Sequence, residues 1–332
     1  MACMTVATLG VTASACSANG GGAEATATDK TIVYTEGAKT VTDWDHFVAG
    51  HENMYAAHGV TLDGVDTQTA TAATQLLVTG EANVGRGLPP AIQTVSQSNG
   101  AVKLISVADL LVRPPFVMNA KGITSWEGLK GTKIGVSSPT DSTAVVTKEA
   151  IKALGFPADS VELVSSGGTG ARYAAMEGGA IDASLLLPPV NFTAEEAGFN
   201  RVGYLPDAMG KDWQFAFTSV IVNPTWAEQN RETLVSFLAA RNDALKWLAD
   251  PANKDEAISI LATETEISEE TAEKVYDLMG IGTADSAFAP EVGVSERAAG
   301  SVLDALQGME QAPQDMEIST MIDDQYAAEA RK

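Results

Sequence analysis

The chain has 332 residues, of which 45% are hydrophobic and 19% are charged, a composition typical of folded globular proteins. This length exceeds what one domain usually needs, so we expect two domains. The 43 acidic and 21 basic residues give a net charge of -22, which argues against nucleic-acid binding. After the N-terminal segment, no run of about 18 apolar residues predicts a transmembrane helix.

Residues 1–16 are uncharged, weakly apolar and rich in small side chains, as in a signal peptide. Ala13-Ser14-Ala15-Cys16 resembles a bacterial lipobox, so we expect cleavage before Cys16 and a lipid on its thiol. Because no Lys or Arg precedes Cys16, an unstructured tail with an incidental cysteine is the alternative. Residues 17–29 have no large apolar side chain and predict a flexible tether.

Short β-rich runs alternate with helical stretches from Thr31 to Leu187, which predicts an α/β protein with parallel-rich sheets covered by helices. A first series runs from 31 to 108 and includes a predicted helix at about 44–58. A second begins near Lys121, with Ser125 as a candidate N-cap, strands at 132–136, 160–164 and 180–187, and helices at 142–154 and 169–177. After a β-like run at 214–223, the pattern is almost entirely helical.

Four segments in this order resemble the periplasmic binding proteins of the sulfonate, taurine, nitrate and thiamine-pyrimidine type. They are 72–85, 126–136, 173–183 and 222–230, and the resemblance spans roughly residues 31–250. It implies a two-lobed type II periplasmic-binding-protein fold with a two-strand hinge, crossing near 111–117 and 215–222. Lobe one would comprise 30–114 and 219–332, and lobe two 115–218. Such proteins close about the hinge when a ligand contacts both lobes.

The turn after the strand at 132–136 is the first candidate for a ligand contact, because ligands of α/β sheets bind where strands lead into helix N-termini. Its position also matches the ligand-binding turn of the resembled family. The candidates are Ser138, Thr140, Asp141, Ser142 and Thr143, whose hydroxyl and backbone N–H groups suit a carboxylate or sulfonate. Asp141 departs from an ideal anion site, and Asp141 or Ser142 capping the helix is an equal alternative.

In lobe one, the loops after the first three strands bring further candidates to the same edge: Trp44, Asp45, Thr69, Thr71, Arg86 and Gly87. Trp44 would stack on a ligand and Arg86 would bind an acidic group through paired hydrogen bonds. The alternatives are interior packing for Trp44 and a surface ion pair for Arg86.

Three further positions complete the predicted site. Leu187 and Pro188 end a strand where members of the resembled family often contact ligand, and we expect them to form an apolar wall. Gln214 and Arg113 lie near the crossings and are within reach of the cleft, although a salt bridge in the hinge explains such residues equally well.

Two other patterns do not predict sites. Residues 165–170 resemble a phosphate-binding loop, but no Lys-Ser or Lys-Thr follows, so we interpret them as a strand-to-helix turn. His51 and His58 are two helical turns apart, too far for a shared metal site, and both cysteines lie in the first sixteen residues. We expect neither a metal nor a cofactor.

The sequence therefore predicts the substrate-binding component of an ABC importer that captures a small organic anion, with a permease and its ATPase as partners. We expect a monomer, held by a lipid anchor on the outer face of the bacterial cytoplasmic membrane. A thiamine-pyrimidine-precursor binding protein and a pyrimidine-synthesising enzyme of the same fold are the alternatives. The enzyme is disfavoured because no cysteine remains after Cys16 and no catalytic triad motif is evident.

Overall fold

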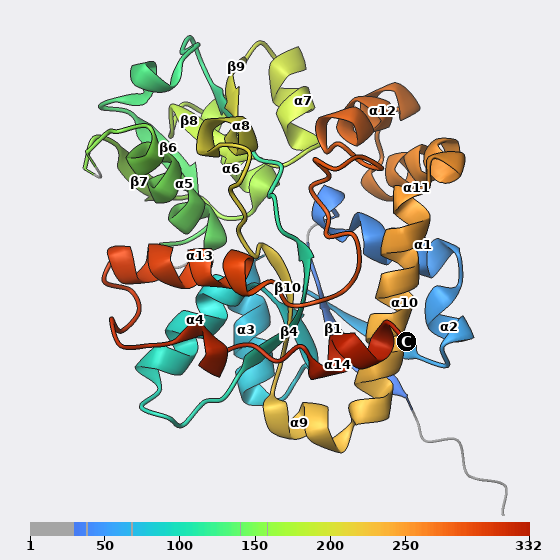
Figure 1. Ribbon diagram of the computed structural model, residues 1–332. Helices are drawn as coiled ribbons and strands as arrows, with labels where there is room; N and C mark the ends of the chain where they lie inside the picture. The colour runs from blue at the N-terminus through green and yellow to red at the C-terminus, as the bar shows by residue number, and fades with distance from the viewer. Residues whose placement is uncertain (1–29, 38, 68, 140, 158) are drawn as a thin grey trace, which may run out of the picture.

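The computed structural model describes residues 30–332 apart from 38, 68, 140 and 158. Within these residues the chain forms two five-stranded sheets, each flanked by helices (Figure 1). In spatial order, sheet one consists of β2 (Thr61–Asp66), β1 (Thr31–Glu36), β3 (Val84–Arg86), β10 (Thr218–Val222) and β4 (Ile105–Leu111). Sheet two consists of β7 (Glu162–Ser165), β6 (Lys133–Val136), β8 (Ala183–Leu186), β5 (Val117–Ala120) and β9 (Asn200–Tyr204). We call the two halves lobe one and lobe two.

The chain crosses between the sheets twice, after β4 and before β10. The crossings run side by side, because Phe215 N donates to Val112 O at 2.8 Å and Phe217 N donates to Leu111 O at 3.1 Å. Each crossing delivers an antiparallel strand: β5 runs against β8 and β9, and β10 runs against β3 and β4. The other pairings, β1 with β2 and β3, and β6 with β7 and β8, are parallel. These two adjacent crossings between the sheets are arranged as a hinge.

Helices cover the outer faces of both sheets (Figure 1). Those joined to sheet one are α1 (Trp44–His51), α2 (Met54–Ala57), α3 (Ala70–Thr79), α4 (Leu88–Gln97), α9 (Pro224–Gln229), α10 (Arg231–Ala249), α11 (Lys254–Thr265), α12 (Glu269–Leu278), α13 (Glu296–Gly308) and α14 (Gln325–Ala330). Those joined to sheet two are α5 (Ser142–Ala153), α6 (Thr169–Glu177), α7 (Val190–Glu196) and α8 (Leu205–Met209). Short 3-10 turns lie at Val41–Asp43, Trp126–Leu129, Pro251–Asn253 and Ile318–Thr320. None of the described helices is both long and apolar enough to cross a bilayer.

Three local predictions differ from the structure. The helix predicted over 44–58 is two helices, because Asn53 adopts a left-handed φ of 56° between them. Ser125 makes no side-chain capping bond, and the turn after it is a 3-10 helix. The β-like run at 214–223 is a strand only over Thr218–Val222, since its first residues belong to the crossing.

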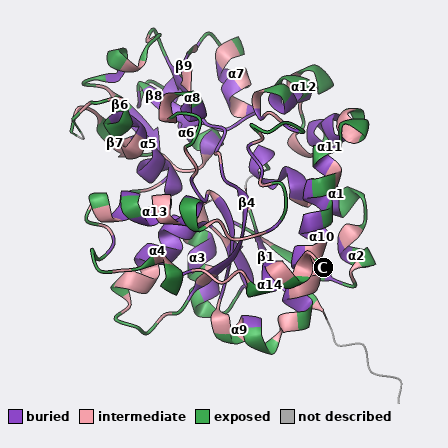
Figure 2. Ribbon diagram, viewed as in Figure 1, coloured by how far each residue is buried: buried purple, intermediate pink, exposed green. Residues whose placement is uncertain are grey.

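The apolar core joins the two lobes on one side of the hinge. Leu88 and Ile92 of α4, Val145 of α5 and Val302 of α13 belong to one buried cluster (Figure 2). In Figure 1, α13 lies between α4 of lobe one and α5 of lobe two. The C-terminal helical region therefore packs on both lobes, and burial of apolar surface favours their approach.

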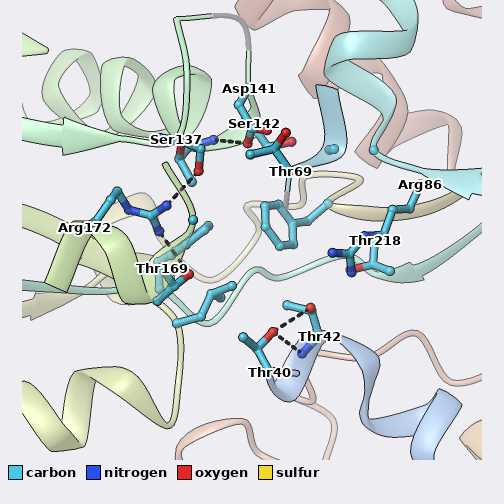
Figure 3. A pocket seen from close by; sticks show the side chains of 17 residues that line it. Thr40, Thr42, Thr69, Arg86, Ser137, Asp141, Ser142, Thr169, Arg172 and Thr218 are labelled. Carbon is cyan, nitrogen blue, oxygen red and sulfur yellow. Dashed lines mark hydrogen bonds between the residues drawn. The ribbon is translucent and has the colours of Figure 1, made fainter. Parts of the chain in front are cut away.

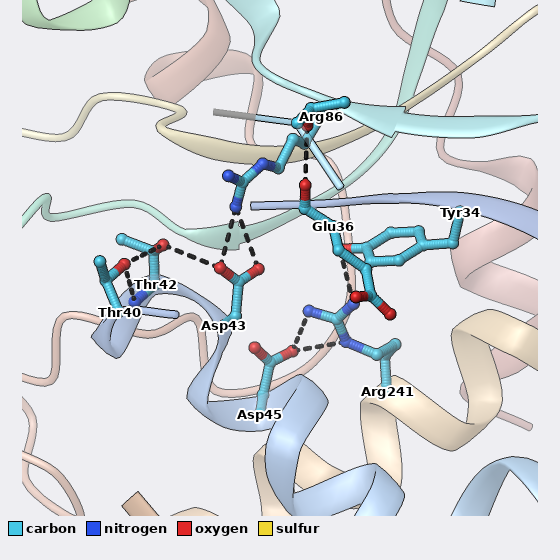
Figure 4. A network of polar contacts seen from close by, with 9 residues as sticks. Tyr34, Glu36, Thr40, Thr42, Asp43, Asp45, Arg86 and Arg241 are labelled. Atoms are coloured by element: carbon cyan, nitrogen blue, oxygen red, sulfur yellow. Dashed lines mark hydrogen bonds and ion pairs between the residues drawn. The ribbon is translucent and has the colours of Figure 1, made fainter. Parts of the chain in front are cut away.

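A polar cluster lies beneath α1 in lobe one. Arg241 of α10 forms a fully buried ion pair with Asp45, with 2.7 Å between Arg241 Nη2 and Asp45 Oδ2, and its Nη1 donates to Tyr34 Oη at 3.5 Å (Figure 4). His46 Nδ1 lies 2.7 Å from Tyr55 Oη. Loss of water around the His46 ring, followed by the charge of Arg241, lowers the pKa of His46 to about 4.

Acid is expected to destabilise the fold partly through His46. Because the ordinary pKa is 6.5 and the folded value is about 4, the unfolded chain binds a proton between these values that the folded chain does not. The contribution to stability is therefore complete above pH 6.5 and is lost as the pH falls toward 4. Urea unfolding across this range should show a shallower pH slope for His46→Asn than for wild type. His58→Asn, at a half-buried histidine, serves as control, and equal slopes for all three proteins would contradict the assignment.

Candidate ligand-binding site

A cavity of about 80 Å³ lies between the lobes, where β3, β6 and β8 end (Figure 3). At roughly 10–15 Å³ for each water position, it has room for a ligand of about five to eight non-hydrogen atoms. The lining residues are Thr40, Thr42, Thr69, Ala70, Arg86, Gly87, Phe116, Ser137, Asp141, Ser142, Thr143, Gly168, Thr169, Arg172, Leu187, Phe217 and Thr218. Eight of these residues carry a hydroxyl group, two are arginines, and Ala70, Phe116, Leu187 and Phe217 supply an apolar part.

Arg172, in the first turn of α6, is fully buried against this cavity. Its five N–H groups donate to Ser137 Oγ at 2.7 Å, Gly167 O at 2.9 Å, Leu185 O at 3.0 Å, Ser184 Oγ at 3.1 Å and Thr169 Oγ1 at 3.2 Å. Burial lowers the pKa of Arg172 to about 10, which leaves the guanidinium charged at neutral pH. Across the described ranges, no carboxylate forms an ion pair with it.

Three cavity hydroxyls in lobe two are arranged as hydrogen-bond donors. Ser137 Oγ and Thr169 Oγ1 each accept an N–H from Arg172, and Thr143 Oγ1 accepts the Ser137 backbone N–H at 2.8 Å. Since each oxygen already accepts one bond, its own proton is directed elsewhere, and no side chain or carbonyl in the described part of the chain takes it. These protons can be donated to an anion in the cavity, and the charge of Arg172 strengthens the donors.

On lobe one, Arg86 of β3 lines the opposite side of the cavity and is paired with Asp43 behind it (Figure 4). Arg86 Nη1 lies 2.9 and 3.1 Å from the two Asp43 carboxylate oxygens. Burial acts to lower the pKa of Arg86, but the adjacent Asp43 carboxylate more than offsets this and raises it. Gly37 packs against the guanidinium so closely that a Cβ atom there would overlap it. Thr42 Oγ1 donates to Asp43 Oδ2 at 3.3 Å, and Thr40 Oγ1 lies 2.9 Å from Thr42 Oγ1.

Asp141 caps α5 at the cavity wall. Its Oδ1 accepts the Thr143 backbone N–H at 3.4 Å, and its side chain is buried. Burial raises the pKa of Asp141, while the N–H of Thr143 and the charges of Arg172 and Arg86 act in the opposite direction. The carboxyl group is therefore more readily protonated than a surface aspartate.

The lobes touch on both sides of the cavity. Thr71 Oγ1 on α3 lies 3.5 Å from Ser138 Oγ in the turn after β6. Val41 N donates to Pro188 O at 3.5 Å. The structure therefore has the lobes in contact around a small enclosed space.

The sequence that forms this site also matches a known protein family. The family model described as "NMT1/THI5 like" matches residues 45–254. The chain belongs to the NMT1/THI5-like family. No relative was found among curated proteins.

Solved structures similar to this NMT1/THI5-like chain have the same fold. The alkanesulfonate-binding protein SsuA from Xanthomonas axonopodis pv. citri, bound to MOPS, has a TM-score of 0.72 and 14% identity, covering 89% of this chain and 98% of SsuA. The periplasmic nitrate-binding protein NrtA from Synechocystis PCC 6803 has a TM-score of 0.72 and 13% identity, covering 91% of this chain and 88% of NrtA. The desulfurization enzyme DSZB has a TM-score of 0.62 and 14% identity, covering 91% of this chain and 98% of DSZB. The predicted two-lobed periplasmic-binding-protein fold is confirmed.

The structure brings half of the predicted site residues of this NMT1/THI5-like chain to the cavity. Those lining it are Thr69, Arg86, Gly87, Asp141, Ser142, Thr143 and Leu187. Thr71, Ser138 and Pro188 instead make the contacts between the lobes. Thr140 and Cys16 lie outside the described residues.

Three predicted contacts require correction. Trp44 is fully buried inside lobe one, where its Nε1 donates to Ala257 O at 3.1 Å, so it has no face to stack on a ligand in the cavity. Asp45 is fully buried in the ion pair with Arg241. Gln214 Oε1 accepts a bond from Ser295 Oγ at 3.4 Å, and Gln214 lines three other cavities beside the second crossing. Arg113 forms a salt bridge with Asp285, with 3.3 Å between Nη1 and Oδ1. A salt bridge was the alternative to a ligand contact at this position.

Sequence reasoning did not identify Arg172, Thr169 and Ser137 as site residues, although they lie at the edge where sheet two meets the cavity. The signal was present, because Thr169 opens α6 within the glycine-rich segment 165–170, which we interpreted only as a strand-to-helix turn. Phe116 and Phe217, one from each crossing, also line the cavity, with ring centroids 5.1 Å apart.

Asp45→Asn should reduce the free energy of unfolding by about 3 kcal/mol, because it leaves the buried Arg241 charge without its carboxylate. Chemical denaturation measures the loss. Asp243→Asn, which removes an exposed partner of His58, is the matched control and should cost less than about 1 kcal/mol. An Asp45→Asn protein as stable as wild type would mean that the ion pair does not hold α1 on α10.

Proposed function

We propose that this chain is the solute-binding component of an ABC importer and that it captures a small organic anion, a sulfonate or a carboxylate. The observation that carries the proposal is Arg172, a fully buried cation at the cavity whose five N–H groups all bond to the protein. A buried charge is costly unless it is compensated, and an anion in the cavity would compensate it.

The hydroxyl groups support an oxyanion in particular. Ser137, Thr143 and Thr169 present three O–H donors from one side of the cavity. Neutral donors of this kind bind an oxyanion without the strong hydration of a lysine. The two binding proteins compared above are named for alkanesulfonate and nitrate, which are both oxyanions.

Hinge closure is part of the proposal. The paired crossings are adjacent extended segments, and beside the cavity the lobes meet through single weak polar contacts at Thr71–Ser138 and Val41–Pro188. A ligand bridging the donors of lobe two and the Thr40–Thr42 face of lobe one would add contacts that exist only when the lobes are together. Differential binding of this kind shifts an open ensemble toward the closed one.

The remaining parts of the proposal concern place and partners. A lipid on Cys16 and the tether at 17–29 would hold a monomeric binding protein at the outer face of the bacterial cytoplasmic membrane. There it would deliver solute to a permease driven by an ATPase. The same fold serves an enzyme in DSZB, so assays for turnover belong beside assays for binding.

Sulfonates or small carboxylates should stabilise the protein, whereas pyrimidines should not, because only a ligand of the folded state raises its melting temperature. Thr169→Val and Ser137→Ala should each weaken the best-binding anion by about tenfold in calorimetric titration, as expected for a lost hydrogen bond to a charged group. Thr193→Val, on an exposed turn of α7, is the control and should bind as wild type. Stabilisation only by pyrimidines, or turnover of the sulfonate, would contradict the proposal.

Small-angle scattering tests closure directly. The radius of gyration should fall when a stabilising anion is added and should stay constant with an uncharged solute of equal size. An unchanged radius at saturating anion would show that binding does not close the hinge.

A further inference from the structure

Another cavity, of about 390 Å³, lies beside the two crossings, and we call it the hinge cavity. Its walls come from both crossings, from the last turns of α10 and from residues 281–290. It shares no lining residue with the cavity between the lobes. Its volume is within the range of about 300–1,000 Å³ that is usual for small-molecule sites.

The inner wall of the hinge cavity is apolar. Five large side chains that line it are at most 8% exposed: Val112, Leu245, Leu248, Ile281 and Phe288. The segment after α12 is fixed to the first crossing, because Val112 N donates to Ala287 O at 3.1 Å and Ala289 N donates to Leu110 O at 2.8 Å. An alkyl chain against this wall would be removed from water.

Arg113 is the only charged residue among the described residues that line the hinge cavity. Its Nη1 lies 3.3 Å from Asp285 Oδ1 and donates to Asp285 O at 3.4 Å. The Asp285 side chain is 81% exposed and does not line the cavity, so this salt bridge is weak. No described residue accepts a hydrogen bond from Arg113 Nη2 or from its buried Nε. The guanidinium therefore has unused donors beside an apolar wall.

A single cation beside an apolar wall is complementary to a molecule with one anionic group and an apolar tail. A carboxylate matches a guanidinium especially well, because two parallel N–H···O bonds can form between them. We infer that the hinge cavity is a second ligand site, which binds a monocarboxylate with an alkyl tail of medium length. The carboxylate would bind Arg113 and the tail would lie against the apolar wall. This inference does not rest on the proposed function, because it concerns a different cavity.

Octanoate and octanamide test the inference in calorimetric titration, because they share a tail and differ in charge. Wild type should bind octanoate at least about tenfold more tightly than octanamide, the usual effect of a hydrogen bond to a charged group. Arg113→Gln should reduce this preference to less than about threefold. Ala249→Phe adds a ring at the exposed rim of the hinge cavity, on the last turn of α10, and should weaken the binding of both compounds.

Two control variants should bind octanoate as wild type does. Arg297→Gln removes an exposed arginine that lies near the second crossing, where it donates to Asp212 O, but that does not line the hinge cavity. Thr169→Val alters the cavity between the lobes, whose volume of about 80 Å³ is too small for octanoate.

Three results would overturn the inference. The first is that octanoate does not bind, either by calorimetry or by changes in NMR chemical shifts, or binds no more tightly than octanamide. The second is a preference in Arg113→Gln equal to that of wild type. The third is loss of octanoate binding in Thr169→Val, which would place this ligand between the lobes. The first two results leave the binding of small anions between the lobes unaffected, and the third would favour it.

Discussion

The buried guanidinium of Arg172 is the group on which the site depends. It reaches Ser137 after β6, Gly167 and Thr169 at the start of α6, and Leu185 on β8, so one side chain connects three strand ends of sheet two. The same bonds fix the direction of the hydroxyl protons that face the cavity. No carboxylate among the described residues forms an ion pair with it, while the charge of Asp141 at the same cavity acts to raise its pKa, so lobe two presents a buried cation and hydroxyl donors to a space that only a small molecule can fill. An acidic protein with a net charge of -22 can bind an anion in this way, since the distant surface carboxylates are screened within about 10 Å at moderate salt.

Lobe one is built differently. Its arginine at the cavity, Arg86, is already neutralised by Asp43, and its buried Arg241 is neutralised by Asp45 (Figure 4). The buried arginine that forms no ion pair among the described residues therefore lies on lobe two, whereas Arg86 and Arg241 of lobe one are both paired. An anion would bind first to lobe two, and lobe one would then complete the enclosure through the two crossings. The apolar cluster that includes α4, α5 and α13 supports the closed arrangement from outside the cavity.

The sequence predicted the architecture well because alternating β-rich and helical runs carry the signal for an α/β sheet in each segment separately. It also predicted the turn at 137–143, since hydroxyl residues between a strand and a helix are a local pattern. Strands β5 and β9 were not predicted, because each is short and its pairing is set by residues far away in the sequence. Trp44 and Asp45 follow the first strand as a ligand-binding pair might, yet their partners Ala257 and Arg241 come from helices more than 190 residues later. The role of Arg172 was missed for the same reason, because its five acceptors come from three segments and no local spacing reveals how they meet.

The most direct measurement is a crystal structure of the protein with hydroxyethanesulfonate bound. We expect the sulfonate oxygens to lie within hydrogen-bond distance of the Ser137, Thr143 and Thr169 hydroxyls, with both lobes contacting the ligand. A sulfonate bound elsewhere, such as the separate cavity of about 480 Å³ beside His46 and Glu264, would contradict the central role of Arg172.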